Sequence, residues 1–327
     1  MSLVLHNRLW VVFVALAGWS CSAPETTPAR PRAGSVAAVD SSVPANVRPS
    51  ALASTVASAL PEASGAPLSS EPPEDDMVTV SGGSFTMGCG KADLACLPNE
   101  KPTHPMLVRP FMIDRLEVTV DDYMRCVRAG VCAFPPTIRS YERCVDSGRC
   151  PPPRSNGVGI CNASDPSRGA HPINCIVTGR DYCKWLGKRL PTATEWERAA
   201  RGADGRTFPW GSEAPSDRRL CWMQDATCPV GSFPEGASPF GALDMAGNVA
   251  ELVDEQYPSV WNPLQYQVAG PDGERSTCSF AKPCTSRGVR GGDYTPGADV
   301  RSSARGTDVL IQYDLPMVGF RCVRDVK

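Results

Sequence analysis

Apolar and polar positions alternate along the segment from Met77 to Gly88, and the pair Gly82-Gly83 interrupts the alternation. Alternation with a period of two is typical of β-strands, and paired glycines are typical of a turn. The pattern predicts a strand, a turn and a second strand. Residues 105–114 form a further extended segment by the same criterion.

Helical periodicity follows in the segment after Thr119. Val120, Tyr123, Met124 and Val127 fall on one face of a helix, as the spacing of an amphipathic helix requires. Thr119 is a residue type that caps a helix, and the two acidic residues of the first turn interact favourably with the helix dipole. We therefore expect a helix that begins at Thr119.

Capping signals predict two more helices. Thr178 with Asp181 approximates a capping box, and Thr192 with Glu195 forms a complete one. Gly202 ends the second of these helices.

One long stretch lacks a clear period. Residues 134–170 are rich in Pro, Gly, Cys and Ser and predict a long loop, which is either an insertion or part of a binding surface. A stretch of short strands and turns is expected to begin at Phe208-Pro-Trp-Gly.

The first twenty residues predict a secretory signal peptide. The apolar run from Leu9 to Ala17 is too short to span a membrane, which takes about 20 apolar residues. Cys21 follows small residues in a way that loosely resembles a bacterial lipoprotein cleavage site, although Gly18 departs from that pattern. We expect a lipid anchor at Cys21, and cleavage after Ala23 into a soluble secreted form is the alternative.

Residues 21–76 predict a disordered tether. They consist mainly of Pro, Ala and Ser with almost no aromatic residues, so they cannot bury enough apolar surface to offset their ordering entropy. The folded domain is expected over residues 77–327. An exported protein, anchored to the membrane or secreted into the periplasm or medium, fits this order.

Charge and histidine content limit the chemistry. The net charge is −2, so no basic surface for nucleic acid is expected. His6, His104 and His171 are the only histidines. Because His6 lies in the signal segment, one chain cannot supply a site with several histidine ligands.

Fifteen cysteines indicate an oxidising compartment. Without Cys21, fourteen remain, an even number as a fully paired domain needs. No CxxC motif occurs, which argues against a zinc ribbon. Short spacings predict a disulfide framework that includes the pairs Cys89/Cys96, Cys126/Cys132, Cys144/Cys150, Cys221/Cys228 and Cys278/Cys284.

A turn between Asp244 and Glu251 could bind a hard cation. Carboxylates at its first and eighth positions, with the backbone carbonyls of Gly247 and Val249 between them, could wrap one calcium ion. By spacing alone, a turn with two solvated carboxylates is the more common outcome.

Several blocks occur in the order found in one family. The chain resembles the formylglycine-generating enzyme (sulfatase-modifying factor) domain from about Met77 to Val326, and the blocks that carry this resemblance are VSGGSFTMG, EVTVDDYMRCV, HPINCIVTGRDYCKWLGKRLPTATEWERAARG, FPWG, FGALDMAGNVAE, VRGGDY and VGFRCVR. The resemblance implies an α+β mixed domain with a C-type-lectin-like core, much irregular structure and many disulfides.

The same resemblance implies further details. It pairs Cys183 with Cys322, which leaves Cys161 and Cys175 to pair with each other. It also raises the expectation of structural calcium at Asp244, Gly247, Val249 and Glu251.

The catalytic cysteines of the family are missing. The family oxidises a peptidyl cysteine with copper(I) held by two thiolates, which come shortly after the Arg-Gly-Gly-aromatic segment. Here no cysteine occurs between Cys284 and Cys322, and Pro296 stands where the first is expected. Copper is therefore not expected. Arg290, Asp293 and Tyr294 remain as residues of a candidate cleft.

The sequence thus favours a non-catalytic, extracytoplasmic binding or scaffold module, for a peptide, protein or glycan. The alternative is an enzyme: a formylglycine-generating oxidase with other ligands, or a divergent oxidoreductase of the same family. No nucleophile–base motif indicates a hydrolase.

Overall fold

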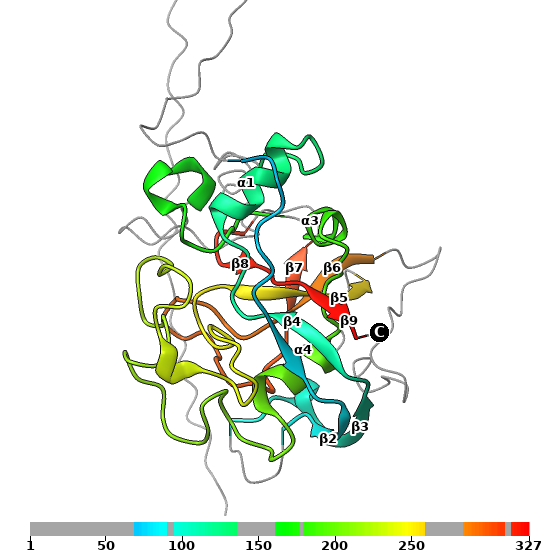
Figure 1. Cartoon of the computed structure of the whole chain (residues 1–327). Coiled ribbons are helices and arrows are strands. Elements are labelled where there is room, and N and C mark those ends of the chain that lie inside the picture. Colours follow the sequence, from blue (N-terminus) through cyan, green and yellow to red (C-terminus); the bar gives the residue numbers. More distant parts are fainter. Residues whose placement is uncertain are drawn as a thin grey trace, which may run out of the picture. The chain divides into compact units, whose positions relative to one another are not determined.

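The computed structural model describes residues 69–89, 95–135, 161–176, 179–258, 284–310 and 315–326. All of them belong to one compact unit, Pro61–Lys327. Its architecture is mixed α/β with much irregular structure, as the sequence predicted (Figure 1). Among these residues, no helix is both long and apolar enough to cross a membrane.

Two small sheets and a two-stranded ribbon make up the described β-structure. The first sheet has the order β1-β4-β9, the second has the order β7-β6-β5-β8, and the ribbon pairs β2 with β3. The strands are β1 (Met77–Val80), β2 (Gly83–Met87), β3 (His104–Val108), β4 (Phe111–Asp114), β5 (Ala250–Pro258), β6 (Cys284–Arg290), β7 (Gly306–Leu310), β8 (Val318–Gly319) and β9 (Val323–Asp325).

The two strands expected at residues 77–88 are present, but they do not pair with each other. β1 pairs with β4, whereas β2 pairs with β3. The single extended segment expected at residues 105–114 is two strands. Pro110, which has no N–H to donate to a ladder, lies between them, and its ring lies 2.8 Å from where a Cβ on Gly82 would be.

The helices follow their capping signals. In α1 (Val120–Arg128), Thr119 accepts a hydrogen bond from the N–H of Asp122, as predicted. In α4 (Ala193–Arg201), Thr192 and Glu195 form the predicted capping box, and Gly202 ends the helix at φ +66°. In α3 (Arg180–Trp185), Gly179 is the N-cap, and Thr178 lies outside the described residues. Short 3-10 helices cover Pro98–Glu100, Asn162–Ser164, Pro166–Arg168 and Pro234–Gly236.

The short strands expected after Phe208 are absent. Residues 203–249 contain turns, one 3-10 helix and a single bridge between Phe208 and Gly211. Proline cannot donate to a strand ladder, and it recurs through this stretch at Pro209, Pro215, Pro229, Pro234 and Pro239.

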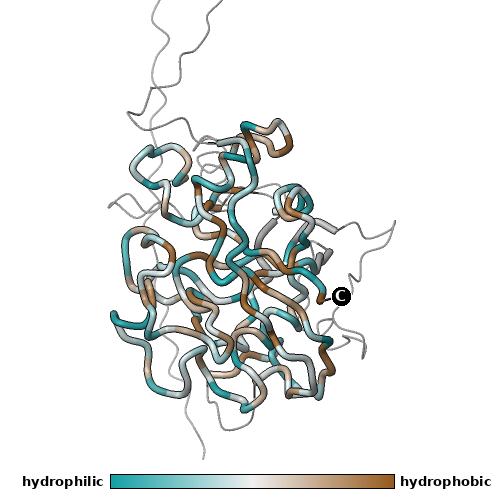
Figure 2. Tube along the Cα trace, in the orientation of Figure 1, coloured by the Kyte–Doolittle hydropathy of each residue, from teal (hydrophilic) through white to brown (hydrophobic). Residues whose placement is uncertain are grey.

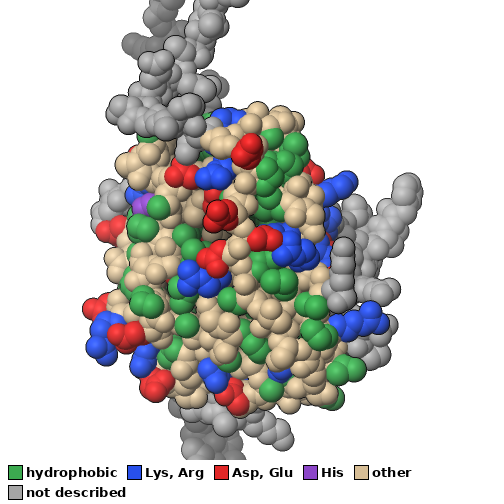
Figure 3. All heavy atoms as spheres, in the orientation of Figure 1, with side chains coloured by type: hydrophobic (Ala, Val, Ile, Leu, Met, Phe, Trp, Pro, Cys, Tyr) green, Lys and Arg blue, Asp and Glu red, His purple; other side chains and the backbone are tan. Residues whose placement is uncertain are grey.

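Two apolar clusters form the main core. One joins α1 and α3 to Phe320, and the rings of Tyr123 and Tyr182 both meet Phe320 edge-on. The other packs Trp196 of α4 against β1–β4. Figure 2 shows apolar and polar residues interspersed along the same segments. Acidic and basic side chains intermingle on the face shown in Figure 3, with no large area of one sign.

Five disulfides lie within the described residues: Cys89–Cys96, Cys126–Cys132, Cys161–Cys175, Cys183–Cys322 and Cys221–Cys228. They include the pair Cys183–Cys322 that the family resemblance implies. Cys144, Cys150 and Cys278 lie outside the described residues, as does any pairing of Cys284.

The last residues of the expected tether contact the domain. Asp75 forms ion pairs with Lys188 and Arg324, and Asp76 forms one with Arg115. β1 begins directly afterwards at Met77.

Candidate functional site

Trp196 on α4 lies between two buried groups of charged side chains. Its indole Nε1 donates to Glu251 Oε2 at 2.7 Å. The guanidinium of Arg290 lies over its ring at 5.5 Å. Trp196 is fully buried, so both groups are within the core.

The first group, here called the acidic centre, consists of Glu117, Asp244, Glu251 and Arg321. Arg321 donates from Nη2 to Glu251 Oε1 at 2.7 Å and from Nε to Oε2 at 2.8 Å. Glu117 accepts from the side-chain amide of Asn248 and from the N–H of Val249. These contacts connect the loop at residues 244–249 to the start of α1 and to the C-terminal segment.

The loop at residues 244–249 has a constrained backbone. Asp244, Gly247 and Asn248 all have φ values between +55° and +78°, a region that Asp and Asn tolerate better than most residues. Gly247 is also required for space, because a Cβ there would lie 2.4 Å from the carbonyl oxygen of Cys221.

Burial disfavours the ionised acids of this centre. It raises the pKa of Glu117 well above its ordinary value, and the charges of Asp244 and Glu251 raise it further. Burial likewise raises the pKa of Asp244. Three carboxylates face one guanidinium, so the fully ionised centre carries a charge of 1 − 3 = −2.

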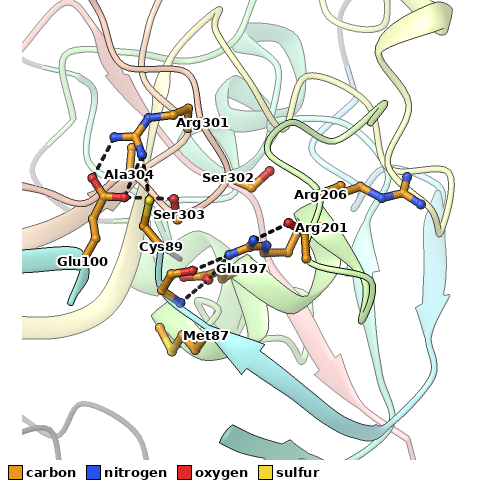
Figure 4. Close-up of polar contacts among 12 residues, drawn as sticks. Met87, Cys89, Glu100, Glu197, Arg201, Arg206, Arg301, Ser302, Ser303 and Ala304 are labelled. Carbon is orange, nitrogen blue, oxygen red and sulfur yellow. Dashed lines mark hydrogen bonds and ion pairs between the residues drawn. The ribbon is translucent and has the colours of Figure 1, made fainter. Parts of the chain in front are cut away.

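The second group, here called the basic centre, consists of Arg201, Arg290, Arg301, Arg305, Glu100, Glu197 and Asp299. Glu197 accepts from Arg201 Nη1 (Figure 4). It also accepts from Arg290 Nη2 and from the N–H of Gly88. Burial opposes ionisation of Glu197, but Arg290, Arg305 and Arg201 together hold its pKa below the ordinary value.

The residues of the candidate cleft lie mostly in the core. Arg290 and Tyr294 are each 2% exposed, so neither offers a surface to a ligand. Tyr294 packs against Cys221, Cys228 and Phe233. Asp293 is half-buried, accepts from the N–H of Thr295, and has a pKa that burial raises. The space beside Tyr294 is therefore filled by the protein's own side chains.

A family model described as "Sulfatase-modifying factor enzyme 1-like domain" matches residues 64–326. The chain belongs to this family.

Relatives in the family include both active and inactive proteins. A formylglycine-generating enzyme of Mycobacterium tuberculosis is 28% identical, with 76% of this chain and 98% of that protein covered. An inactive C-alpha-formylglycine-generating enzyme 2 of Bos taurus is 27% identical over 76% of this chain and 87% of that protein. A hercynine oxygenase of Mycolicibacterium smegmatis is 30% identical over 76% of this chain and 61% of that protein.

Among solved structures, PvdO from Pseudomonas aeruginosa resembles this chain with a TM-score of 0.59. The two share 27% identity over 76% of this chain and 94% of that one. This agrees with the fold class that the sequence predicted.

The family's thiolate chemistry has no donors in the described part of the chain. Every cysteine whose side chain is described is in a disulfide. Pro296 lies in the turn after Tyr294. His104 contacts the carbonyl of Pro102, and His171 contacts Thr227. These residues do not fit a copper(I) site.

Calcium at this loop stays a prediction. The donor types are suitable, because carboxylates and backbone carbonyls are the ligands that calcium prefers, and the ionised charge of −2 would be balanced by one divalent cation. Among the described residues, however, the acidic, Cys and His side chains that already lie close enough together to share an ion are Cys89, Cys96 and Glu100. Glu251 accepts three hydrogen bonds, so one of its four lone pairs remains for a metal. Asp244, Gly247, Val249 and Glu251 would hold the ion.

Sequence reasoning missed Glu117, Trp196 and Arg321 as partners of this loop. Each lies in a block that carries the family resemblance, EVTV, EWER or GFRC. The blocks do not show that these three side chains converge, since Glu117 and Arg321 are about 200 residues apart.

Proposed function

We propose that this chain is a non-catalytic binding module of the sulfatase-modifying factor family, exported and anchored to a membrane through Cys21. The observation that carries the proposal is the state of its cysteines. The segment after Arg290-Gly-Gly has none before Cys322, and every cysteine with a described side chain is in a disulfide. Copper(I) binding as a dithiolate needs two deprotonated thiols.

Because the space beside Tyr294 is filled, we look for the ligand-binding surface in another part of the domain. Phe208, Trp210 and Trp222 are partly exposed and pack on the same small core cluster. Phe208 and Trp210 stack at 5.1 Å, and Arg219 lies over Trp210. Aromatic residues and arginine are enriched at recognition surfaces. We assign the ligand-binding face to this aromatic group.

Arg219 gives this face a polar contact. Its guanidinium lies over the Trp210 ring and donates to the carbonyl of Ala214, and a guanidinium has five N–H donors that can bind acceptors on a ligand. Extended peptides carry such acceptors on every residue.

The discriminating experiment uses one probe, a sulfatase-type peptide that contains cysteine. The purified chain is incubated with the peptide, copper(I) and oxygen, peptide mass is followed, and binding is measured in parallel by tryptophan fluorescence. We expect binding without conversion, and weaker binding in Trp222→Ala. Aldehyde formation would establish the alternative, an oxidase, and absence of binding would contradict the peptide-binding role.

The anchor has its own test. The wild type should partition with membranes, and Cys21→Ala should move to the soluble fraction. Cys21→Ala protein that still partitions with membranes would contradict lipidation at this residue.

A further inference from the structure

Met223 combines an exposed apolar side chain with a backbone conformation that methionine rarely adopts. Its φ of +58° lies in the left-handed region, where the Cβ of an ordinary residue crowds a carbonyl oxygen. The residue is 57% exposed, so burial in the core does not explain why a methionine stands there. Met223 therefore carries backbone strain at a surface position.

The other described non-glycine residues with a positive φ have structural contacts. Cys175 is fully buried and forms a disulfide. Asp244 and Asn248 are buried, and the side chain of each forms a hydrogen bond to another segment. Asp and Asn also tolerate the left-handed region better than most residues. Met223 differs from all three in its exposure, and its residue type makes the strain larger than in Asp244 or Asn248.

The disulfide loop, residues 221–228, is fixed at both ends. The bond Cys221–Cys228 closes the loop. The carbonyl of Cys221 accepts from the N–H of Asn248 at 2.8 Å, and the N–H of Cys228 donates to Oδ1 of Asn248 at 3.0 Å. Strain of this kind persists only where the surrounding structure enforces it, and it recurs at ligand-binding sites.

Within the disulfide loop, the backbone of Gln224 is attached to the core. Its N–H donates to the carbonyl of Tyr294 at 2.8 Å. Met223 and Asp225, on either side of Gln224, are both exposed. Asp225 forms no ion pair with any residue that the structure describes. The loop thus has an apolar side chain and an unneutralised carboxylate two positions apart on its solvent side.

These two residues follow directly on the aromatic group assigned above to ligand binding. Trp222 belongs to that group, because it packs on the same small core cluster as Phe208 and Trp210. Methionine is flexible and polarisable, and it is common at surfaces that bind apolar side chains. A carboxylate such as Asp225 favours a basic partner, and complementary charge adds specificity to an interface.

From these observations we propose that the disulfide loop determines which peptides bind. Met223 contacts an apolar side chain of the peptide, and Asp225 pairs with a lysine or arginine beside it. The strain at Met223 is retained because it holds the thioether toward the ligand. This inference rests on the peptide-binding function proposed above, and it adds the class of peptide, one with neighbouring apolar and basic residues.

The first test selects peptides without assuming their sequence. The purified chain is immobilised and used to select from a phage-displayed library of random short peptides. The wild type should enrich peptides with an apolar residue beside lysine or arginine, by about threefold or more over the unselected library. Met223→Asn should lose the enrichment of the apolar residue and keep that of the basic residue. Asp225→Asn should show the opposite loss.

The outcomes of this selection separate the inference from the function on which it rests. A wild type that enriches no peptide would contradict both. Enriched peptides that lack the apolar and basic pair would overturn the inference alone. The same pattern in the wild type and in both variants would also overturn it, because the pair would then be recognised by other residues.

The second test separates strain from contact by thermal unfolding. Asparagine tolerates the left-handed region, so Met223→Asn should raise Tm by roughly 2 °C while it weakens peptide selection. Met223→Leu keeps both the apolar side chain and the strain, so its Tm and its selected peptides should match those of the wild type.

The control for this test is Leu107→Asn. Leu107 is 78% exposed on β3 and has no positive φ, so its replacement should neither raise Tm nor change the selected peptides. A Tm of Met223→Asn at or below that of the wild type would overturn the proposal that strain is retained for binding. A Met223→Leu variant that selects no apolar residue would contradict the apolar contact.

Discussion

The acidic and basic centres both contact Trp196, but the pKa values of their buried glutamates shift in opposite directions. The acidic centre has three carboxylates and one guanidinium, and the pKa of Glu117 is raised there. In the basic centre, burial opposes the ionisation of Glu197, but the charges of Arg290, Arg305 and Arg201 lower its pKa. Trp196 donates to Glu251 of the first and lies under Arg290 of the second. Two carboxylates that are both fully buried thus shift in opposite directions.

The difference follows from the charges around each carboxylate. Burying an unbalanced charge is expensive, so such a group either neutralises or acquires a counter-ion. The acidic centre has three carboxylates for one guanidinium, and a calcium ion would supply the missing positive charge. Glu197 of the basic centre already has three guanidinium groups that favour its ionised form.

The largest effect is expected from Arg321→Leu. It removes the guanidinium of the acidic centre and leaves Glu251 without two of its three donors. Loss of one partner of a buried ion pair costs about 3–5 kcal/mol. Urea denaturation should show this loss in the free energy of unfolding. Arg324→Leu is the control, since Arg324 is 38% exposed beside Asp75 and should cost at most about 1 kcal/mol.

A loss below about 1 kcal/mol in Arg321→Leu would mean that the acids of this centre are already protonated in the native protein. The acidic centre would then carry no charge imbalance.

Glu197→Gln tests the basic centre in the same way. The amide keeps the shape and can still accept hydrogen bonds, but it leaves Arg290 and Arg201 without their carboxylate. We expect a loss of about 3 kcal/mol in the free energy of unfolding at neutral pH.

The pH dependence of Glu197 gives the sign of its contribution. Its pKa is lowered in the native state from an ordinary value of 4.5. The stability that it contributes is therefore present above about pH 4.5 and lost as the pH falls through the lower native pKa. The wild type should lose stability more steeply than Glu197→Gln in that acid range. Parallel pH profiles of the two would contradict the lowered pKa.

Calcium removal should have a moderate effect on the acidic centre alone. At a free calcium concentration 100 times Kd, binding stabilises the native state by about 2.7 kcal/mol. A chelator should then lower Tm by roughly 5–10 °C for a domain of this size. Asp244→Asn should reduce the response. An unchanged Tm in the chelated wild type would contradict calcium at Asp244, Gly247, Val249 and Glu251.

Much of the local structure could be predicted from the sequence because its signals are local. The capping box of Thr192 and Glu195 and the cap at Thr119 depend on residues within four positions of each other, and both are present. Strand pairing depends on distant partners. The Gly-Gly break between β1 and β2 suggested that they are neighbours, whereas each pairs with a strand of residues 104–114.

The charged centres could not be predicted for the same reason. Glu197 and Arg290 come from α4 and β6 and are separated by 93 positions. A helix pattern shows that Glu197 lies on α4, but not that its face is buried against three arginines. The family blocks identified Arg290 and Tyr294 as residues of a candidate cleft, but both side chains are buried in the core.

The smallest and sharpest test of the comparison is Asp299→Asn. Asp299 is the most exposed member of the basic centre, with a side chain 37% exposed, and it pairs with Arg301. Asparagine keeps an oxygen for the N–H of Arg301 but removes one negative charge beside its guanidinium. Because the pair is partly solvated, the free energy of unfolding should change by less than about 1 kcal/mol. Urea denaturation of the variant beside the wild type measures this difference. A loss above about 2 kcal/mol would show that the Asp299–Arg301 pair behaves as a buried ion pair in spite of its exposure.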